Sequence, residues 1–292
     1  MSHSNSFHPA TALRDAMGRG IVMAPGAPDS LTARLVERAG FPAVYMTGLG
    51  ATAARLGQPD LGLLTGTEMA EHARSMARAV GIPVVADADT GYGGVLNIRR
   101  TVRDYAQAGV AALHLEDQMA PKRCGQLSGI RLMEAEESAE RLRAAVAARG
   151  MDDMLIIGRT DALAAAGIDA ALERARRYQD TGIDLVFVDG IKTIAETEAV
   201  ARAIQGPKVM TVVDGTETVG LTADVLQQMG FSIVFYAVST LFTAMRAVSE
   251  TLSALKRDGT PRARAGAMVS YGEFAEVVGL HGQQEWATRF GG

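Results

Sequence analysis

The chain has 292 residues, 48% hydrophobic and 21% charged, with a formal net charge of −4 at pH 7. This composition can bury a large core, and the absence of a strongly basic stretch argues against a nucleic acid or an anionic membrane as partner. The single cysteine, Cys124, excludes an intrachain disulfide and suits a cytoplasmic protein. The polar start, MSHSNSFHPA, carries no apolar signal core, and no uncharged apolar run reaches the roughly 18 residues of a membrane span.

Eight short runs are predicted to be strands, and each is nearly continuous in apolar residues, as expected for a parallel sheet covered on both faces. They span Gly20–Ala24, Ala43–Thr47, Pro83–Asp87, Ala111–Glu116, Met154–Arg159, Leu185–Val188, Val209–Val213 and Ile233–Ala237. Amphipathic helices are predicted between them, including Asp29–Ala39, Ile98–Ala108, Ala135–Ala148, Ile168–Asp180 and Ile194–Ile204.

A helix end, a glycine and a strand recur in that order as AGFPAVYM, AGVAALHL, TGIDLVFV and MGFSIVFY. One connection used four times indicates a β/α array, although it does not separate a closed barrel from an open sheet. Eight strands and the chain length favour a single (β/α)8 TIM-type barrel domain over residues 1–292, with 258–292 as a helical extension. Helices predicted over Leu241–Leu255 and Ser270–Phe290 could cap the barrel or pack on a partner subunit.

Polar residues follow most of the apolar runs, where active-site groups of a barrel lie. We expect them to emerge at one face: Tyr45, Thr47, Asp87, Asp89, Glu116, Asp117, Arg159, Asp161, Asp189 and Asp214. Crowded carboxylates repel unless a cation neutralises them, and oxygen ligands indicate Mg²⁺ or Mn²⁺. The alternative for DADTGYG, at 87–93, is an Asp-rich turn that caps the next helix.

Three further features allow two interpretations each. Arg159 is either a clamp for a substrate carboxylate or phosphate or an ion-pair partner of the surrounding acids. The loop PKRCGQLSG, at 121–129, is either a gating loop with a proton donor or an incidental site of a surface thiol, whose pKa Lys122 and Arg123 would lower. His114 is either a ligand or, more commonly, a satisfied buried histidine.

The glycine-rich run from Gly48 to Gly62 lacks both the P-loop pattern and a dinucleotide fingerprint. It is predicted to be a flexible loop or a set of backbone N–H groups that hold an anion.

The motifs YMTGLGATAARLGQPDLG, DADTGYGG, HLEDQMAPKRCGQ and GRTDA together resemble the isocitrate lyase/phosphoenolpyruvate mutase superfamily over nearly the whole chain. Within it the sequence is most similar to the 2-methylisocitrate lyase, 2,3-dimethylmalate lyase and carboxyvinyl-carboxyphosphonate phosphorylmutase groups. The resemblance implies a barrel whose last helix is swapped between subunits and a homotetramer built from dimers. It therefore changes the interpretation of the C-terminal segment from a local cap to an oligomer element.

The resemblance also implies a ligand set. Mg²⁺ would be held by Asp87 and Glu116, with Asp89 acting largely through water. The substrate contacts would be Thr47, Gly48 and Leu49 on a 2-oxo-acid part and Arg159 on its carboxylate, with Asp60 near the metal.

In the carbon–carbon lyases that the sequence resembles, the tyrosine matching Tyr45 takes the proton of the substrate hydroxyl. The cysteine matching Cys124 gives a proton to the carbanion released by cleavage. Both are present here, which favours a lyase that cleaves a substituted malate- or isocitrate-like 2-hydroxy acid. Gln126, Asp189 and Thr211 depart from the usual His, Glu and Asn, and Asp214 stands near a usual Glu. These changes indicate a substrate other than methylisocitrate, or impaired cleavage.

Two alternatives stay open at this point. One is chemistry on a phosphonopyruvate- or phosphoenolpyruvate-like substrate, or a decarboxylase-like activity on oxaloacetate. The other is a non-catalytic protein that keeps the metal site and binds a dicarboxylate, which the altered Gln126 motivates.

Overall fold

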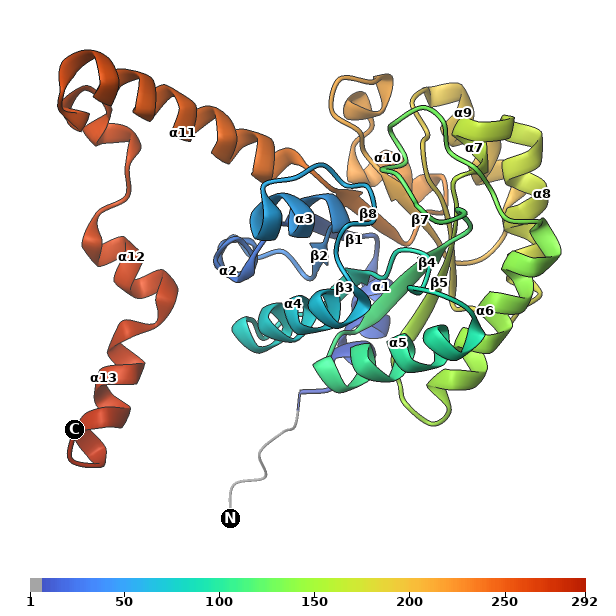
Figure 1. Cartoon of the computed structure of the whole chain (residues 1–292), viewed down its shortest axis with the longest axis horizontal. Coiled ribbons are helices and arrows are strands. Elements are labelled where there is room, and N and C mark those ends of the chain that lie inside the picture. Colours follow the sequence, from blue (N-terminus) through green and yellow to red (C-terminus); the bar gives the residue numbers. More distant parts are fainter. Residues whose placement is uncertain (1–6) are drawn as a thin grey trace.

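The computed structural model describes residues 7–292, and its eight parallel strands close into a barrel (Figure 1). The strands are β1 (Val22–Ala27), β2 (Val44–Met46), β3 (Val84–Asp87), β4 (Ala112–Glu116), β5 (Leu155–Thr160), β6 (Leu185–Val188), β7 (Lys208–Thr211) and β8 (Ile233–Tyr236). Each strand pairs with the next in chain order, and β8 pairs with β1 to complete the ring. The predicted (β/α)8 barrel is confirmed.

Helices follow the strands and cover the outside of most of the barrel (Figure 1). They are α1 (Pro9–Arg19), α2 (Ser30–Arg38), α3 (Gly48–Leu56), α4 (Gly66–Ala79), α5 (Val95–Ala108), α6 (Ala135–Arg149), α7 (Ala162–Ala166), α8 (Ile168–Gln179), α9 (Ile194–Ala203), η1 (Glu217–Gly220), α10 (Ala223–Gln228), α11 (Ser239–Asp258), η2 (Pro261–Ala267), α12 (Tyr271–Val278) and α13 (Leu280–Arg289). Three of them begin with reciprocal capping boxes, in which Thr65 pairs with Glu68, Thr193 with Glu196 and Ser270 with Glu273. Among the helices of residues 7–292, none has the length and apolar character needed to cross a membrane.

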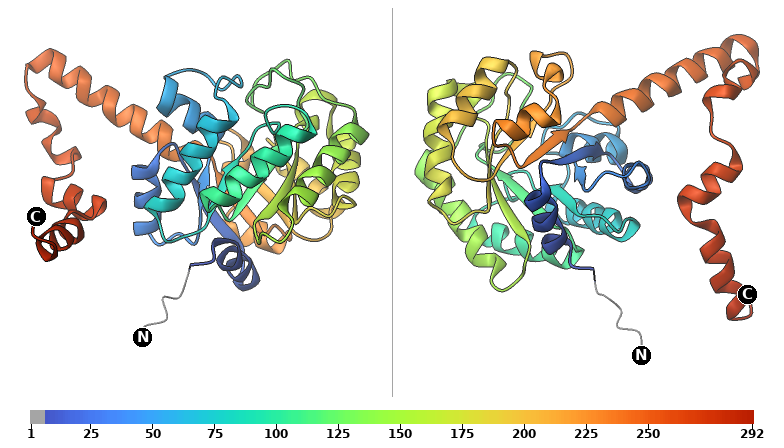
Figure 2. Two further views of the ribbon diagram at one scale, coloured as in Figure 1. Left: turned by 60° about the horizontal axis from the view of Figure 1, so that its bottom comes forward. Right: turned by 180° about the vertical axis from the view of Figure 1, so that it is seen from behind.

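Alternate strand residues point inward and fill the barrel, as the two-residue period of a strand requires. Tyr45, Phe187 and Phe235 belong to this inner cluster together with Leu13 of α1, which is fully buried. Helix α1 therefore lies across one end of the barrel, opposite the end that the strand C-termini form (Figure 2). Helix α1 was not predicted from the sequence, because a helix before the first strand is not part of the repeated strand–helix unit.

Strand β1 extends past its predicted end at Ala24, through Pro25 and Gly26. This Pro-Gly pair is typical of a turn, yet Gly26 pairs with Tyr45 of β2 and lies against the chain that follows β8. A Cβ atom at Gly26 would lie 2.1 Å from the carbonyl oxygen of Ala237. Glycine is therefore required there by close backbone approach.

The C-terminal arm, residues 239–292, leaves the barrel as the long helix α11 and continues through α12 and α13 (Figures 1 and 2). A stripe of large apolar side chains on α11 is exposed, at Phe242, Met245, Val248 and Leu252. The local-cap alternative fails, because only Ala254 of α11 is buried. Such a stripe is what an exchange of helices between subunits would cover. The exchange, the tetramer and the domain limits at 1–292 and 258–292 stay predictions.

We expect the substitution Gly26→Ala to lower the free energy of unfolding by about 3 kcal/mol, because the new methyl group has no space against the Ala237 backbone. Urea unfolding followed by circular dichroism measures this change. The matched control is Gly18→Ala near the end of α1, where nothing lies within 4 Å of the added Cβ atom. This control should be neutral or stabilising by up to about 1 kcal/mol. Equal stability of both variants would contradict the close approach.

Candidate active site

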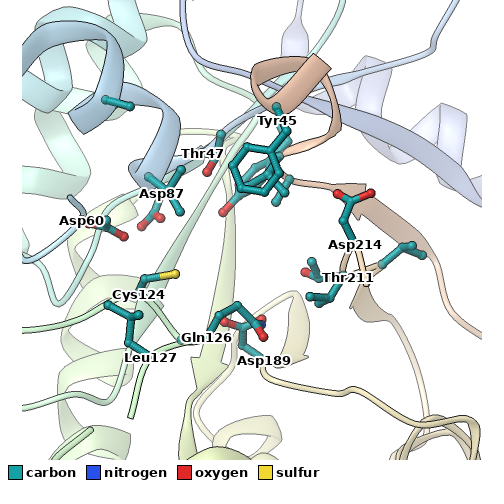
Figure 3. Close-up of a pocket in the computed structure, with 18 of the residues that line it drawn as sticks. Tyr45, Thr47, Asp60, Asp87, Cys124, Gln126, Leu127, Asp189, Thr211 and Asp214 are labelled. Carbon is teal, nitrogen blue, oxygen red and sulfur yellow. The ribbon is translucent and has the colours of Figure 1, made fainter. Parts of the chain in front are cut away.

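A cavity of about 630 Å³ opens at the C-terminal ends of the strands (Figure 3). Residues from the sequence analysis that line it are Tyr45, Thr47, Leu49, Asp60, Asp87, Cys124, Gln126, Arg159, Asp189, Thr211 and Asp214. Figure 3 shows Asp60, Asp87 and Cys124 on one side and Thr211 and Asp214 on the other. Three predicted site residues, Gly48, Asp89 and Glu116, are not part of the lining.

A cluster of buried carboxylates lies beside the cavity, formed by Asp60, Asp87, Asp89 and Glu116. The ammonium group of Lys122 lies between two of them, with Nζ 2.7 Å from Asp60 Oδ1 and 2.5 Å from Asp89 Oδ1. Burial alone would lower the pKa of Lys122, but the surrounding carboxylates raise it well above its ordinary value. Lys122 is therefore a fixed positive charge inside the acidic cluster.

Two acids of this cluster, Asp89 and Glu116, hold their protons more tightly than an exposed carboxylic acid does. Burial and the neighbouring carboxylates of Asp87 and Asp60 raise the pKa of Asp89 to about 6, against the opposing effect of Lys122. Burial likewise raises the pKa of Glu116 well above its usual range. Within residues 7–292, neither carboxylate oxygen of Glu116 accepts a hydrogen bond, although Arg159 Nε lies 3.3 Å from Oε2. Buried carboxylate oxygens without hydrogen-bond partners are costly, and a bound cation would stabilise them.

These carboxylates suit a hard divalent cation in their donor chemistry, because all the available ligand atoms are oxygens. Lys122 acts as a stand-in positive charge on Asp89, and Glu116 has free oxygen lone pairs. Within the described part of the chain, however, no group of three or more acidic, histidine or cysteine side chains is arranged as a metal cluster. The residues fit the ion, and the side chains would have to adjust to surround it.

The turn that carries Asp89 is strained and held from outside the cavity. Asp89 and Tyr92 have φ angles of +46° and +59°, which non-glycine residues rarely adopt. Arg141 of α6 donates hydrogen bonds to the carbonyl oxygens of Thr90 and Gly93, at 2.6 and 2.7 Å. The alternative of a helix-capping turn fails, because α5 begins after Gly94 without a side-chain cap.

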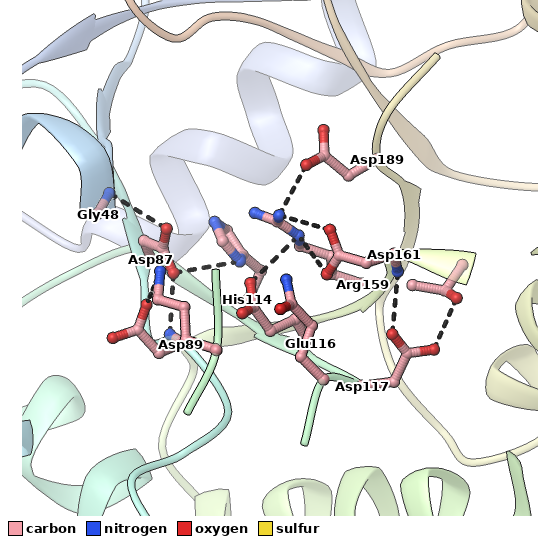
Figure 4. A network of polar contacts seen from close by, with 12 residues as sticks. Gly48, Asp87, Asp89, His114, Glu116, Asp117, Arg159, Asp161 and Asp189 are labelled. Atoms are coloured by element: carbon pink, nitrogen blue, oxygen red, sulfur yellow. Dashed lines mark hydrogen bonds and ion pairs between the residues drawn. The ribbon is translucent and has the colours of Figure 1, made fainter. Parts of the chain in front are cut away.

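Arg159, at the end of β5, is enclosed by acids (Figure 4). Its Nη2 lies 2.7 Å from both Asp161 Oδ1 and Asp189 Oδ2, and the guanidinium lies 5.4 Å from the centre of the Phe187 ring. The ion-pair interpretation of Arg159 is therefore present in the structure. Since Arg159 also lines the cavity, the same group can face a substrate.

Asp117 faces away from the cavity, so the expectation that all strand-end polar groups emerge at one face is wrong for this residue. Its carboxylate accepts hydrogen bonds from the Thr160 hydroxyl at 2.6 Å and the Asp161 backbone N–H at 2.9 Å (Figure 4). It also accepts one from the Tyr178 hydroxyl at 2.8 Å. Successive strand residues alternate in direction, and Glu116 takes the inward one. Asp117 thereby fixes the end of β5 that presents Arg159.

Tyr45 and His114 form a buried pair at the base of the cavity. Tyr45 Oη lies 3.0 Å from His114 Nε2, and the Tyr45 ring stacks on Phe235 at 4.0 Å. Burial lowers the pKa of His114 to about 4 and raises that of Tyr45 well above its ordinary value. His114 is thus a neutral buried histidine, as the commoner interpretation predicted, while its Nδ1 lies 3.8 Å from Asp87 Oδ1.

Residues 121–129 form a loop, here called the lid, that lies over the cavity through Cys124, Gly125, Gln126 and Leu127. The Cys124 N–H donates to the backbone carbonyl of Asp60 at 3.1 Å. Gly125 packs so closely on Arg159, Asp161 and Asp189 that an added Cβ atom would lie 2.2 Å from Asp189 Oδ2. The lid is therefore closed onto the ion pairs of Arg159.

The predicted lowering of the Cys124 pKa is wrong. Burial raises the pKa of the thiol to about 11. Lys122 points to Asp60 and Asp89, and Arg123 donates to the Ser128 carbonyl oxygen, so neither neighbour in sequence neutralises a thiolate. Cys124 is a protonated thiol at the cavity wall instead of an incidental surface thiol.

The flexible-loop interpretation of the glycine-rich run is wrong for Gly48–Leu56, which forms α3. The Gly48 N–H does hold an anion, but it is the chain's own: it donates to Asp87 Oδ2 at 3.1 Å. A Cβ atom at Gly48 would lie 2.6 Å from that oxygen. Gly48 therefore positions Asp87, while Thr47 and Leu49 on either side line the cavity.

Two features of the site were missed by the sequence analysis. Lys122 was considered only as a charge beside a thiol, and its partners Asp60 and Asp89 lie far from it in the sequence. The apolar outer wall, with Val212 and Phe242, was not predicted. Phe242 also begins the exposed apolar stripe of α11.

Comparison with known sequences agrees with this architecture. The family described as phosphoenolpyruvate phosphomutase matches residues 13–256. The 2,3-dimethylmalate lyase of Eubacterium barkeri is 41% identical over 272 residues, covering 93% of this chain and 94% of the relative. The 2-methylisocitrate lyase of Aeropyrum pernix is 36% identical, covering 94% and 88%.

Solved structures show the same likeness. Oxaloacetate acetylhydrolase in complex with 3,3-difluorooxalacetate superposes with a TM-score of 0.91 at 36% identity, covering 98% of both chains. A phosphonopyruvate hydrolase complex with oxalate and Mg²⁺ gives 0.87 at 30% identity, covering 97% of this chain and 99% of the other. The prediction of an enzyme family is confirmed, and the chain belongs to the phosphoenolpyruvate mutase/isocitrate lyase superfamily.

Proposed function

We propose that the protein is a Mg²⁺-dependent carbon–carbon lyase that cleaves a substituted malate- or isocitrate-like 2-hydroxy acid into a 2-oxo acid and a second carboxylate. The observation that carries this proposal is that Tyr45 and the protonated thiol of Cys124 line one cavity beside the carboxylate of Asp87. Cleavage of this kind needs a group that takes a proton and a group that gives one. Relatives named as lyases support the reaction class.

The metal ligands in this proposal are Asp87 and Glu116, with Asp89 acting through water. When bound, Mg²⁺ (or Mn²⁺) would supply positive charge that stabilises the oxygen anion formed during cleavage. Gly48 and the Lys122 ammonium hold two of these carboxylates, Asp87 and Asp89, at the edge of the cavity. The Mg²⁺ in the phosphonopyruvate hydrolase complex supports a divalent ion for the family.

Tyr45 would receive the proton of the substrate hydroxyl. Because burial keeps the Tyr45 phenol protonated, it can accept a proton only while passing its own to a neighbour. His114 Nε2, 3.0 Å away and neutral, is positioned to be that neighbour. The pair therefore performs proton transfer without a phenolate in the resting protein.

Cys124 would protonate the carbanion released by the cut. A thiol with a pKa of about 11 holds its proton at neutral pH and can give it to a stronger base. The closed lid places this thiol at the cavity wall and covers the reacting centre, which limits access of water to the carbanion.

The substrate end of the cavity supports a compact substrate with an apolar substituent. We assign the substrate carboxylate to Arg159 and the 2-oxo-acid part to Thr47, Gly48 and Leu49, with Asp60 nearby. Asp189 binds Arg159 directly, and Thr211 lies across the cavity beside Val212 and Phe242. An alkyl group would find apolar contact there, so we propose a substituted malate over a tricarboxylate. A cytoplasmic homotetramer with a small-molecule substrate completes the proposal.

Wild-type protein should release a 2-oxo acid from at least one member of a panel of alkyl-substituted malates and isocitrates, detected by coupled reduction. The variant Cys124→Ser should lose about 100-fold or more in kcat, because a serine hydroxyl is a much weaker acid. Tight oxalate binding without any turnover would instead support a dicarboxylate-binding protein. Products from oxaloacetate, or phosphorus NMR signals from phosphonopyruvate, would replace the lyase assignment by the corresponding alternative.

Removal of metal by EDTA should abolish turnover, and Mn²⁺ should restore it. In calorimetric titration with Mn²⁺, Glu116→Gln should bind at least tenfold more weakly than wild type, because it loses a charged ligand. The matched control is Asp214→Asn, which removes a carboxylate from the opposite wall of the cavity. Equal loss in both variants would show that general charge, not ligation, sets the affinity.

His114 should make stability depend on pH. Its pKa is about 4 in the folded protein and ordinarily 6.5, so its contribution is complete above pH 6.5 and is lost as pH falls towards 4. The total is up to about 3 kcal/mol. In urea unfolding of the metal-free protein, the free energy of unfolding should therefore fall less between pH 6.5 and 4 for His114→Gln than for wild type. Identical slopes would mean that His114 does not stay neutral on folding.

A further inference from the structure

We infer that Lys122, in the lid, neutralises the Asp89 carboxylate as an internal counter-ion in the metal-free protein. When a metal ion binds, Lys122 releases Asp89 and keeps its ion pair with Asp60. This inference rests on the proposed metal site. It assigns Lys122 as a positioning residue that keeps the lid seated through Asp60 and releases Asp89 when a metal ion binds. Three observations carry the inference.

The first observation is the location of the ammonium. Nζ contacts Asp60 at 2.7 Å and Asp89 at 2.5 Å, and the Lys122 side chain is 5% exposed. Asp87 and Glu116 act on the same charge from a greater distance. Two positive centres that draw on one buried carboxylate oppose each other, because like charges repel more strongly in a buried site than in water.

The second observation is that the contact is built into the fold. Gly62 has a φ of +69°, and a Cβ atom there would lie 3.3 Å from Lys122 Cγ. The turn before α4 thus leaves space for the lysine stem to reach the cluster. A side chain that only steadied a surface loop would not need this space.

The third observation concerns Asp60, which holds the lid twice. Its carboxylate binds Lys122, and its backbone carbonyl accepts the Cys124 N–H at 3.1 Å. Since these contacts do not involve Asp89, the lid can stay seated when Asp89 is released. Lys122 therefore closes the lid over the site with or without a metal ion.

The test is the affinity for Mn²⁺ alone, measured by calorimetry without substrate. Lys122→Met should bind Mn²⁺ at least tenfold more tightly than wild type, because the competing charge is gone. Lys122→Arg, which keeps the charge, should bind as weakly as wild type. The matched control is Arg123→Met, which removes a charge from the same lid. The Arg123 side chain donates its hydrogen bond to the Ser128 carbonyl oxygen and not to the acidic cluster. If Lys122→Met does not fold, the same comparison is made with Lys122→Gln, which also removes the charge but can still donate a hydrogen bond to Asp60.

A second readout uses the single thiol. Without metal, Lys122→Met should raise the rate of Cys124 alkylation several-fold, because the lid loses its contact with Asp60 and Asp89, and Arg123→Met should not. Unchanged or weaker Mn²⁺ binding by Lys122→Met would overturn the inference and leave the lyase proposal intact. No Mn²⁺ binding by wild type would overturn the metal site and the inference together, which separates the two failures.

Discussion

The arrangement of this site depends on the neutralisation of carboxylates that are buried together. Six acids converge at one end of the barrel: Asp60, Asp87, Asp89, Glu116, Asp161 and Asp189. Among residues 7–292, Lys122 and Arg159 are the buried cations that pair with acids of this group. An unpaired buried charge is costly, so ion pairs hold Asp60, Asp89, Asp161 and Asp189 in place, while the Gly48 N–H holds Asp87. The lid takes its position from the same requirement, since it brings Lys122 to one group of acids and seats Gly125 on the other.

The barrel makes this concentration of charge possible. Parallel strands place their carboxyl ends at one edge, so residues as far apart in the sequence as Asp60 and Asp189 meet there. Structural supports lie outside the cavity: Asp117 holds the end of β5, and Arg141 holds the strained turn at Asp89. Rigid elements thus carry the acids, and the lid supplies a cation and the thiol. In the proposed reaction, Tyr45 and Cys124 would exchange protons with the substrate from these supports.

Elements that repeat or follow a fixed period could be predicted from the sequence. Features that depend on contacts between residues distant in the sequence could not. Continuous apolar runs located all eight strands, and strand-end positions located Asp87, Arg159 and Asp189. The end of β1 was misplaced because the need for Gly26 arises from Ala237, more than two hundred residues away. The Cys124 pKa was misjudged because Lys122 and Arg123 are neighbours in sequence only. The glycine-rich run likewise did not indicate that the Gly48 N–H donates to Asp87, which lies 39 positions away in the sequence.

The protonated state of Cys124 has a consequence for the chemistry of sulfur. Oxidants and alkylating agents attack the thiolate, and a thiol with a pKa of about 11 has very little thiolate at neutral pH. The burial that keeps the proton on sulfur also makes this cysteine a poor nucleophile. If Cys124 donates a proton as proposed, the same environment would serve that role and protect the sulfur from oxidation.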